Sequence, residues 1–314
     1  MVNANHPPIL VTGAPRSGTT FLGKMLSLHS SVAYIDEPFN LETGIKGIDR
    51  HLAYITKKQT ETEQYYAELL QSLLQGKSAF KQSDLRSPTA SVIRQTARQL
   101  FVSRENLGYK LNARNPLKSR RLLKDPMACF ASEYLHRELG AKTVVILRHP
   151  ASTIASYKRL GWHFDLNDLL SQPELMKDHL EPILGRVNIK KLNPVQEWAY
   201  FWLAIHAVLD TFLKCNAAML KIRHEDLSLK PLHHLHWLYE KLELPFTSKV
   251  KQKIIDHTNI ENPAAAPDNA PHVLKRHSAS VINQWRKILT PEEIAQIKEI
   301  VSPFSQRWYT DREW

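Results

Sequence analysis

The segment at residues 9–20 constrains the fold of this 314-residue chain more than any other. A short apolar run at residues 9–12 leads into a loop, after which apolar residues recur at helical spacing. The loop reads Gly13, Ala14, Pro15, Arg16, Ser17, Gly18, Thr19 and Thr20. A strand, a turn with two glycines and a helix start direct successive backbone N–H groups at one place. We therefore expect an anion-binding cradle here.

The other strand candidates favour an α/β fold. They cover residues 32–35, 122–124, 143–147 and 218–222, lack polar alternation and are separated by helical stretches. Strands of this kind are typical of a parallel sheet that is buried on both faces. We predict a P-loop-type parallel β-sheet flanked by helices. The expected helices include residues 61–75, 86–101, 126–139, 194–212, 232–242 and 291–301.

The chain contains no low-complexity linker, so we expect a single domain over residues 1–314. Two stretches lack strong periodicity or are rich in Ala, Pro and Asn, namely residues 161–193 and 262–284. Such long irregular segments are often functional. We interpret both as excursions over the active-site side of the sheet.

Composition narrows the classes of partner and compartment. Lys and Arg number 42 against 31 Asp and Glu, which gives a net charge of +11 and favours anionic partners. The two cysteines exclude a disulfide scaffold and a cysteine-rich zinc site, which favours a reducing compartment. We see neither a secretory signal nor the roughly 18 apolar residues of a membrane span. We expect a cytoplasmic protein without a membrane span.

The loop departs from the Walker A pattern of kinases and ATPases. Its glycines have the spacing G-x-x-x-x-G, but Thr19 occupies the position of the invariant lysine. That lysine supplies charge to the phosphates of a nucleoside triphosphate, so its absence argues against those enzymes. Arg16 places a cation inside the loop instead.

In this loop and in a second motif the sequence resembles the sulfotransferases that use 3′-phosphoadenosine 5′-phosphosulfate (PAPS). Their loop reads P-[KR]-S-G-T-[TS], which residues 15–20 match in full. Their second signature is an arginine at a strand end and a serine eight positions later, as in Arg148 and Ser156. The bacterial, carbohydrate and tyrosylprotein members are more similar than the cytosolic aryl enzymes, which have a loop lysine and a histidine base.

The resemblance implies PAPS as the sulfuryl donor. The 5′-phosphosulfate would lie on Pro15, Arg16, Ser17, Gly18, Thr19 and Thr20. Arg148 and Ser156 would hold the 3′-phosphate, and Lys275, in a segment similar to the one that closes over the nucleotide in the family, would contact a phosphate. Sulfuryl carries less charge than phosphoryl, and the sequence shows no clear set of metal ligands, so we expect no metal.

Glu37 is our candidate for the catalytic base, with Arg16 and Lys124 as catalytic cations. Glu37 follows Arg16 by 21 positions and ends the next strand, which in a parallel sheet places it at the same carboxyl edge. Carbohydrate and tyrosylprotein sulfotransferases have a glutamate at a similar place. Asp36 could exchange roles with it. Lys124 ends another strand and could neutralise the departing phosphate or bind an acidic acceptor.

Two rival functions remain open at this stage, a P-loop nucleotide kinase or NTPase and a non-catalytic module that binds nucleic acid or heparin. The basic residues are spread through the chain, so we expect no nucleic-acid partner. The acceptor could be a small molecule, a carbohydrate or a peptide, bound through loops such as 40–60 and 161–193. A basic stretch could guide an anionic acceptor, namely Lys110, Arg114, Lys118, Arg120 and Arg121.

Overall fold

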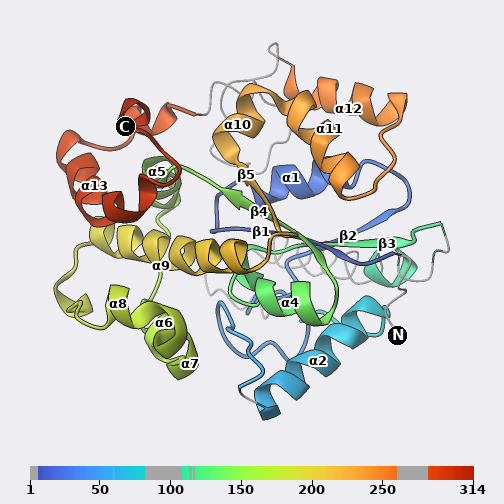
Figure 1. The fold of residues 1–314 in the computed structure, drawn as a ribbon, viewed down its shortest axis with the longest axis horizontal. Coiled ribbons are helices and arrows are strands. Elements are labelled where there is room, and N and C mark those ends of the chain that lie inside the picture. Colours follow the sequence, from blue (N-terminus) through green and yellow to red (C-terminus); the bar gives the residue numbers. More distant parts are fainter. Residues whose placement is uncertain (1–5, 59, 82–107, 113–114, 116, 260–281) are drawn as a thin grey trace, which may run out of the picture.

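A parallel sheet organises the computed structural model (Figure 1). The structure describes residues 6–58, 60–81, 108–112, 115, 117–259 and 282–314. Within these ranges five strands pair in parallel in the order β2-β3-β1-β4-β5. They are β1 (Ile9–Thr12), β2 (Val32–Asp36), β3 (Arg120–Lys124), β4 (Lys142–Leu147) and β5 (Leu220–Arg223). The predicted α/β fold with a parallel sheet is confirmed.

Helices cover both faces of the sheet (Figure 1). The first group is α1 (Thr19–Leu26), α2 (Thr60–Leu74), α4 (Ser132–Glu138), α5 (Pro150–Leu160), α6 (Asn167–Leu170) and α7 (Pro173–Leu175). The second is α8 (Glu181–Leu184), α9 (Pro194–Cys215), α10 (His224–Leu229), α11 (Pro231–Lys241), α12 (Ser248–Thr258) and α13 (Pro291–Ser305). Among the described residues, no helix has the length and apolar character needed to cross a membrane.

Alternate side chains of the central strand β1 explain why residues 9–11 are all apolar. Ile9 and Val11 pack against α1, α11 and α12, whereas Leu10 points to the opposite face, where it packs with residues of α2 and α4. All three side chains are fully buried. A strand that is covered on both faces reads as a continuous apolar run, which is the pattern on which the prediction depended.

Side-chain caps and prolines define where the long helices α9 and α13 begin. Asn193 caps α9 and Thr290 caps α13, each in a reciprocal capping box with the residue three positions later. Proline occupies the first turn of both helices, where its missing N–H costs nothing. Helix α13 begins at the predicted residue, Pro291, and continues to Ser305, four residues beyond the predicted end.

One other expectation needs correction. Residues 126–139 form a 3-10 turn, Pro126–Ala128, and a separate helix α4, because the Ser132 hydroxyl donates to the carbonyl of Cys129 and the chain turns between them. Residues 161–193, interpreted as an excursion over the active-site side, contain short helices whose buried leucines pack against α9, and their role at the site stays a prediction. The helix expected at 86–101 lies outside the described residues.

Candidate active site

The loop at the end of β1 has a backbone that only glycine tolerates at two positions. Gly13 and Gly18 have φ of 153° and 103°, and a Cβ on Gly13 would lie 2.2 Å from the carbonyl oxygen of Ile146. The backbone of Arg16 is also in the left-handed region, with φ of 67°. The N–H of Ser17 donates to the carbonyl of Ala14 at 3.0 Å and closes the turn. This conformation leads the chain directly into α1.

The loop fits an anionic group. Gly18 precedes the first turn of α1 without a side-chain cap, which leaves backbone N–H groups directed at the loop. The Ser17 hydroxyl is fully buried and has no hydrogen-bond partner among the described residues. A buried polar atom without a partner is costly, and a phosphate or sulfate oxygen would satisfy it.

The two motifs of the sequence meet in space. Arg148 follows β4 and donates from Nη1 to the carbonyl of Arg16 at 2.7 Å. Arg16 in turn donates from Nε to the hydroxyl of Ser156, on α5, at 3.1 Å. The loop, the arginine and the serine therefore form one site at the carboxyl edge of β1 and β4.

Two aromatic residues that the sequence did not reveal support this site. The Tyr157 hydroxyl donates to the carbonyl of Pro15 at 2.8 Å, and the Trp162 ring centroid lies 5.6 Å from the guanidinium carbon of Arg16. Both follow Ser156 closely on or just after α5. Their closeness in sequence to Ser156 could have indicated that they lie beside the phosphate-binding loop.

Arg148 is a partly buried cation that would benefit from an anion. Burial lowers its pKa to about 10, and the neighbouring Arg16 acts in the same direction, whereas Glu225 opposes both. The Arg148 Nε atom has no hydrogen-bond partner among the residues described. A phosphate beside this guanidinium would offset its desolvation and accept its remaining N–H groups.

Glu37, Asp36 and Lys124 come together at the adjoining strand ends. The Lys124 Nζ atom donates to Glu37 Oε1 at 2.6 Å and lies 2.5 Å from Asp36 Oδ1. Lys124 is 2% exposed. Burial by itself would lower the pKa of this lysine, but the two carboxylates outweigh that effect, and the pKa is raised. The carboxylate and the cation proposed from the sequence therefore form a direct ion pair.

Asp125 is a member of this group that the sequence analysis did not assign. Its carboxyl group is fully buried and accepts from the N–H groups of Phe39 at 2.6 Å and Met127 at 2.8 Å. Burial raises its pKa to about 8, and Glu37 adds to the shift. The Asp-Pro pair that starts a turn was visible in the sequence, whereas the bond to Phe39, 86 positions away, was not.

His149 does not have the character of a base. Its ring stacks on Trp285 at 5.5 Å, and burial lowers its pKa to about 3. Its N–H donates to Glu225 Oε1 at 2.9 Å, which is consistent with structural roles for both residues. Asp226, on α10, pairs with Arg223, three positions before it, at 3.6 Å.

Three members of the basic stretch, Lys118, Arg120 and Arg121, do not face this site, so the structure does not support a role for them in guiding an acceptor. Arg120 begins β3, at the opposite edge of the sheet from Lys124, and donates to the carbonyl of Leu242 at 3.0 Å. Arg121 and Lys118 also donate to backbone carbonyls. Arg114 and Lys275 lie outside the described residues.

The two loops expected to shape the acceptor pocket touch each other. Tyr54 donates its N–H to Gln172 Oε1 at 2.9 Å, and its hydroxyl donates to Asp178 at 3.1 Å. Lys58 Nζ completes the cluster by donating to Asp178 at 2.7 Å. The segments at 40–58 and 161–193 therefore pack as one unit.

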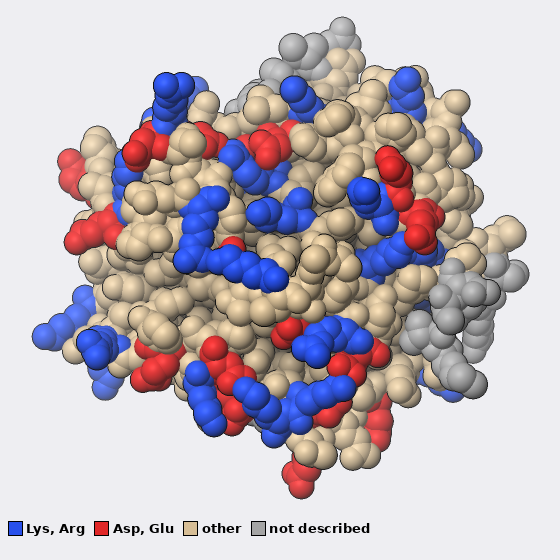
Figure 2. All heavy atoms as spheres, in the orientation of Figure 1, with Lys and Arg blue, Asp and Glu red and all other residues tan. Residues whose placement is uncertain are grey.

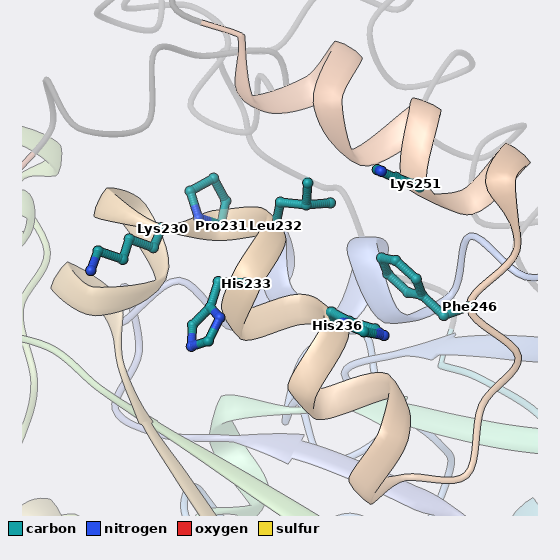
Figure 3. A pocket seen from close by; sticks show the side chains of 7 residues that line it. All are labelled: Lys230, Pro231, Leu232, His233, His236, Phe246 and Lys251. Carbon is teal, nitrogen blue, oxygen red and sulfur yellow. The ribbon is translucent and has the colours of Figure 1, made fainter.

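Surface charge on one face and a cavity beside α11 and α12 can be compared with the predicted site. Figure 2 shows Lys and Arg side chains spread over the face viewed, with Asp and Glu among them. A cavity of about 780 Å³ lies beside α11 and α12 (Figure 3) and includes none of the predicted site residues. It is lined by Lys230, Pro231, Leu232, His233, His236, Phe246 and Lys251.

Within the described ranges no three His, Cys, Asp or Glu residues form a metal-binding group, and the expected absence of a metal stays a prediction.

Comparison with known proteins places the chain in a family. A model of the sulfotransferase family matches residues 7–248. The chain therefore belongs to the sulfotransferase family, as the resemblance indicated. No curated protein sequence matches it significantly.

Several solved structures are similar over nearly the whole chain. A sulfotransferase domain from the curacin biosynthetic pathway is 18% identical, with 95% of this chain and 98% of that chain covered and a TM-score of 0.47. A sulfotransferase of Mycobacterium avium is 12% identical, with 98% and 78% covered and a TM-score of 0.47. A mouse sulfotransferase complexed with PAP is 15% identical, with 96% and 84% covered and a TM-score of 0.44.

Proposed function

We propose that this protein transfers the sulfuryl group of PAPS to a hydroxyl or amine of an acceptor, with Glu37 as the base. The observation that carries the proposal is the hydrogen-bonded chain from Arg148 through Arg16 to Ser156, because it joins the two motifs of PAPS recognition in one site. Membership in the sulfotransferase family supports the same reaction class.

The donor would bind across the carboxyl edge of β1 and β4. The loop at residues 13–20 would hold the 5′-phosphosulfate through its backbone N–H groups, the Ser17 hydroxyl and Arg16. Arg148 and Ser156 would hold the 3′-phosphate. The partly buried guanidinium of Arg148 then gains a counter-charge and a charge-assisted hydrogen bond.

In the proposed reaction PAPS supplies an activated sulfuryl group whose bridging S–O bond breaks. Glu37 accepts the proton of the acceptor hydroxyl or amine while that atom forms its bond to sulfur. The electron pair of the broken bond stays on the phosphate oxygen, where Arg16 and Lys124 neutralise the developing charge. The ion pair between Lys124 and Glu37 supports this division of roles, since it holds the proton acceptor beside the cation.

The acceptor belongs to a broad class of small molecules, carbohydrates or peptides. The contact between Tyr54 and Gln172 favours one composite wall, made from residues 40–58 and 161–193, over two independent loops. Trp162 brings an aromatic ring with 37% exposure to this side. Incubation with labelled PAPS and a cell extract, followed by mass spectrometry of the labelled product, would identify the acceptor.

Calorimetry tests the donor assignment directly. We expect 3′-phosphoadenosine 5′-phosphate (PAP), the product nucleotide, to bind without added metal and more tightly than Mg-ATP. Binding of Mg-ATP in the absence of any binding of PAP would instead support the P-loop kinase or NTPase alternative and contradict the proposal.

A further inference from the structure

Asp125 lies where the ends of two strands and the Glu37 segment meet. Its N–H donates to the carbonyl of Val11 at 2.9 Å, and its own carbonyl accepts from the Thr12 hydroxyl at 2.7 Å. These bonds fasten the backbone after β3 to the end of β1, directly before the phosphate-binding loop. The carboxyl group is fully buried, so protein donors must satisfy its oxygens.

The two carboxyl oxygens of Asp125 accept hydrogen bonds from two different segments. Oδ1 accepts from the N–H of Met127 at 2.8 Å and caps the turn after β3. Oδ2 accepts from the N–H of Phe39 at 2.6 Å. Phe39 follows Glu37 by two positions, so this second bond fixes the segment that carries the proposed base.

Glu37 needs such support because its backbone is unfavourable. It has φ of 42°, in the left-handed region that L residues with side chains rarely adopt unless their surroundings hold them there. The N–H of Glu37 donates to the carbonyl of Lys124 at 2.8 Å. Lys124 therefore holds the strained residue itself, and Asp125 holds the segment two positions after it, at Phe39.

We propose that Asp125 is a positioning residue that holds the Glu37 carboxylate in its direction for proton transfer, an inference that rests on the proposed function. It acts through Phe39 and contacts neither the donor nor the acceptor. If the hydrogen bond to Phe39 is lost, the strained backbone at Glu37 can relax, and the carboxylate moves away from Lys124 and the acceptor. A displacement of about 1 Å at a reacting group can cost on the order of 100-fold in rate.

The Asp125→Asn variant tests the proposal, because an amide cannot accept from both N–H groups. We measure release of PAP from PAPS, with 2-phenylethanol or water as the acceptor, and binding of PAP by calorimetry. We expect kcat to fall about 10- to 100-fold while PAP affinity changes less than about threefold. The matched control Glu133→Gln converts another hydrogen-bonded carboxylate, on α4, and should keep kcat within about twofold.

A double-mutant cycle with Glu37→Gln separates positioning from general structural damage. If Asp125 acts through Glu37, adding Asp125→Asn to Glu37→Gln should lower kcat less than about threefold further. Losses that multiply would overturn the proposal, and so would an unchanged kcat in the single variant. If the unmodified protein neither binds PAP nor releases it from PAPS, the proposed function itself fails.

Asp125→Ser keeps the inference testable if the asparagine variant does not fold. Serine can still cap the turn at Met127, but its short side chain leaves the N–H of Phe39 without this acceptor. The same fall in kcat and the same lack of additivity with Glu37→Gln would support the proposal. If neither variant folds, Asp125 serves the stability of the fold, and the positioning role is overturned.

Discussion

The Nε atom of Arg16 donates to the hydroxyl of Ser156 at 3.1 Å, although 140 positions separate the two residues. Ser156 therefore stands beside the loop that would bind the 5′-phosphosulfate while belonging to the motif that would bind the 3′-phosphate. Arg148 closes the arrangement through the carbonyl of Arg16. A donor with two anionic groups would engage both motifs at once, and this is why the loop and α5 should contribute separately to affinity.

Arg148→Ala and Ser156→Ala should weaken PAP selectively. Each removes a charge-assisted hydrogen bond to the 3′-phosphate, worth about 1.5 to 3 kcal/mol, so PAP affinity should fall roughly 10- to 150-fold. Affinity for AMP, which lacks that phosphate, should change much less. Calorimetry with both nucleotides measures the difference, with Arg159→Ala, an exposed arginine on α5, as the control. Equal weakening for PAP and AMP would contradict the assignment.

Glu37→Gln should lower kcat on the order of 10² to 10⁴-fold and leave PAP affinity nearly intact. The amide keeps the size of the side chain but cannot accept the acceptor proton. Steady-state turnover of PAPS, together with calorimetry of PAP, tests this expectation. Turnover within a fewfold of the unmodified protein would place the base elsewhere, and Asp36→Asn would then be the next variant. An acceptor that is already ionised could hide the effect, so turnover should also be measured at lower pH.

The strands that position the site could be predicted because each carries its own signal. Residues 9–11 and 144–147 are uninterrupted apolar runs that lead into a loop, and a parallel sheet requires such loops to meet at one edge. Arg16, Glu37, Lys124 and Arg148 each follow or end a strand. Their common location thus followed from topology before any side-chain contact was known.

The supporting contacts could not be predicted, because they join residues far apart in sequence through tertiary packing. Nothing near Asp125 in the sequence indicates that its carboxyl group accepts a hydrogen bond from the N–H of Phe39. Arg120 points away from the site because it begins β3 rather than ending it. A basic run in the sequence gives charge but not the edge of the sheet to which that charge points. The position of each basic residue along β3, which the pairing with β2 shows, decides which edge of the sheet its side chain faces.

Two buried histidines should make the protein sensitive to acid. Burial lowers the pKa of both His149 and His206 to about 3, whereas an unfolded histidine has a pKa of about 6.5. Their contribution to stability is present above about pH 6.5 and is lost as pH falls toward 3, because the unfolded chain then binds more protons. Between these pH values, the protonation of each histidine in the unfolded chain should lower the free energy of unfolding by about 1.4 kcal/mol for each pH unit of acidification.

Urea unfolding at several values between pH 7 and pH 4 measures this slope. His206→Phe keeps a ring stacked on Trp202 and should remove the share of the slope due to His206, although it also loses the bond to the Trp202 carbonyl. The exposed His236, changed to glutamine, provides the control because its side chain contacts water in both states. An identical slope in the unmodified protein and in His206→Phe would show that His206 does not contribute.

Arg16→Ala should reduce turnover more than it weakens binding of the donor, because charge on the bridging oxygen grows as the S–O bond breaks. Arg16→Lys should retain part of the activity, since a cation remains, but it would lose the planar guanidinium that reaches Ser156 and lies over Trp162. The measurement is kcat for PAPS turnover compared with PAP affinity in each variant. Thr19→Lys recreates the Walker-type lysine and should not produce ATP hydrolysis, because Arg148 and Ser156 still define the pocket. Mg-dependent ATPase activity in the unmodified protein, together with PAPS turnover that ignores Arg16→Ala, would contradict both the donor and the role of this arginine.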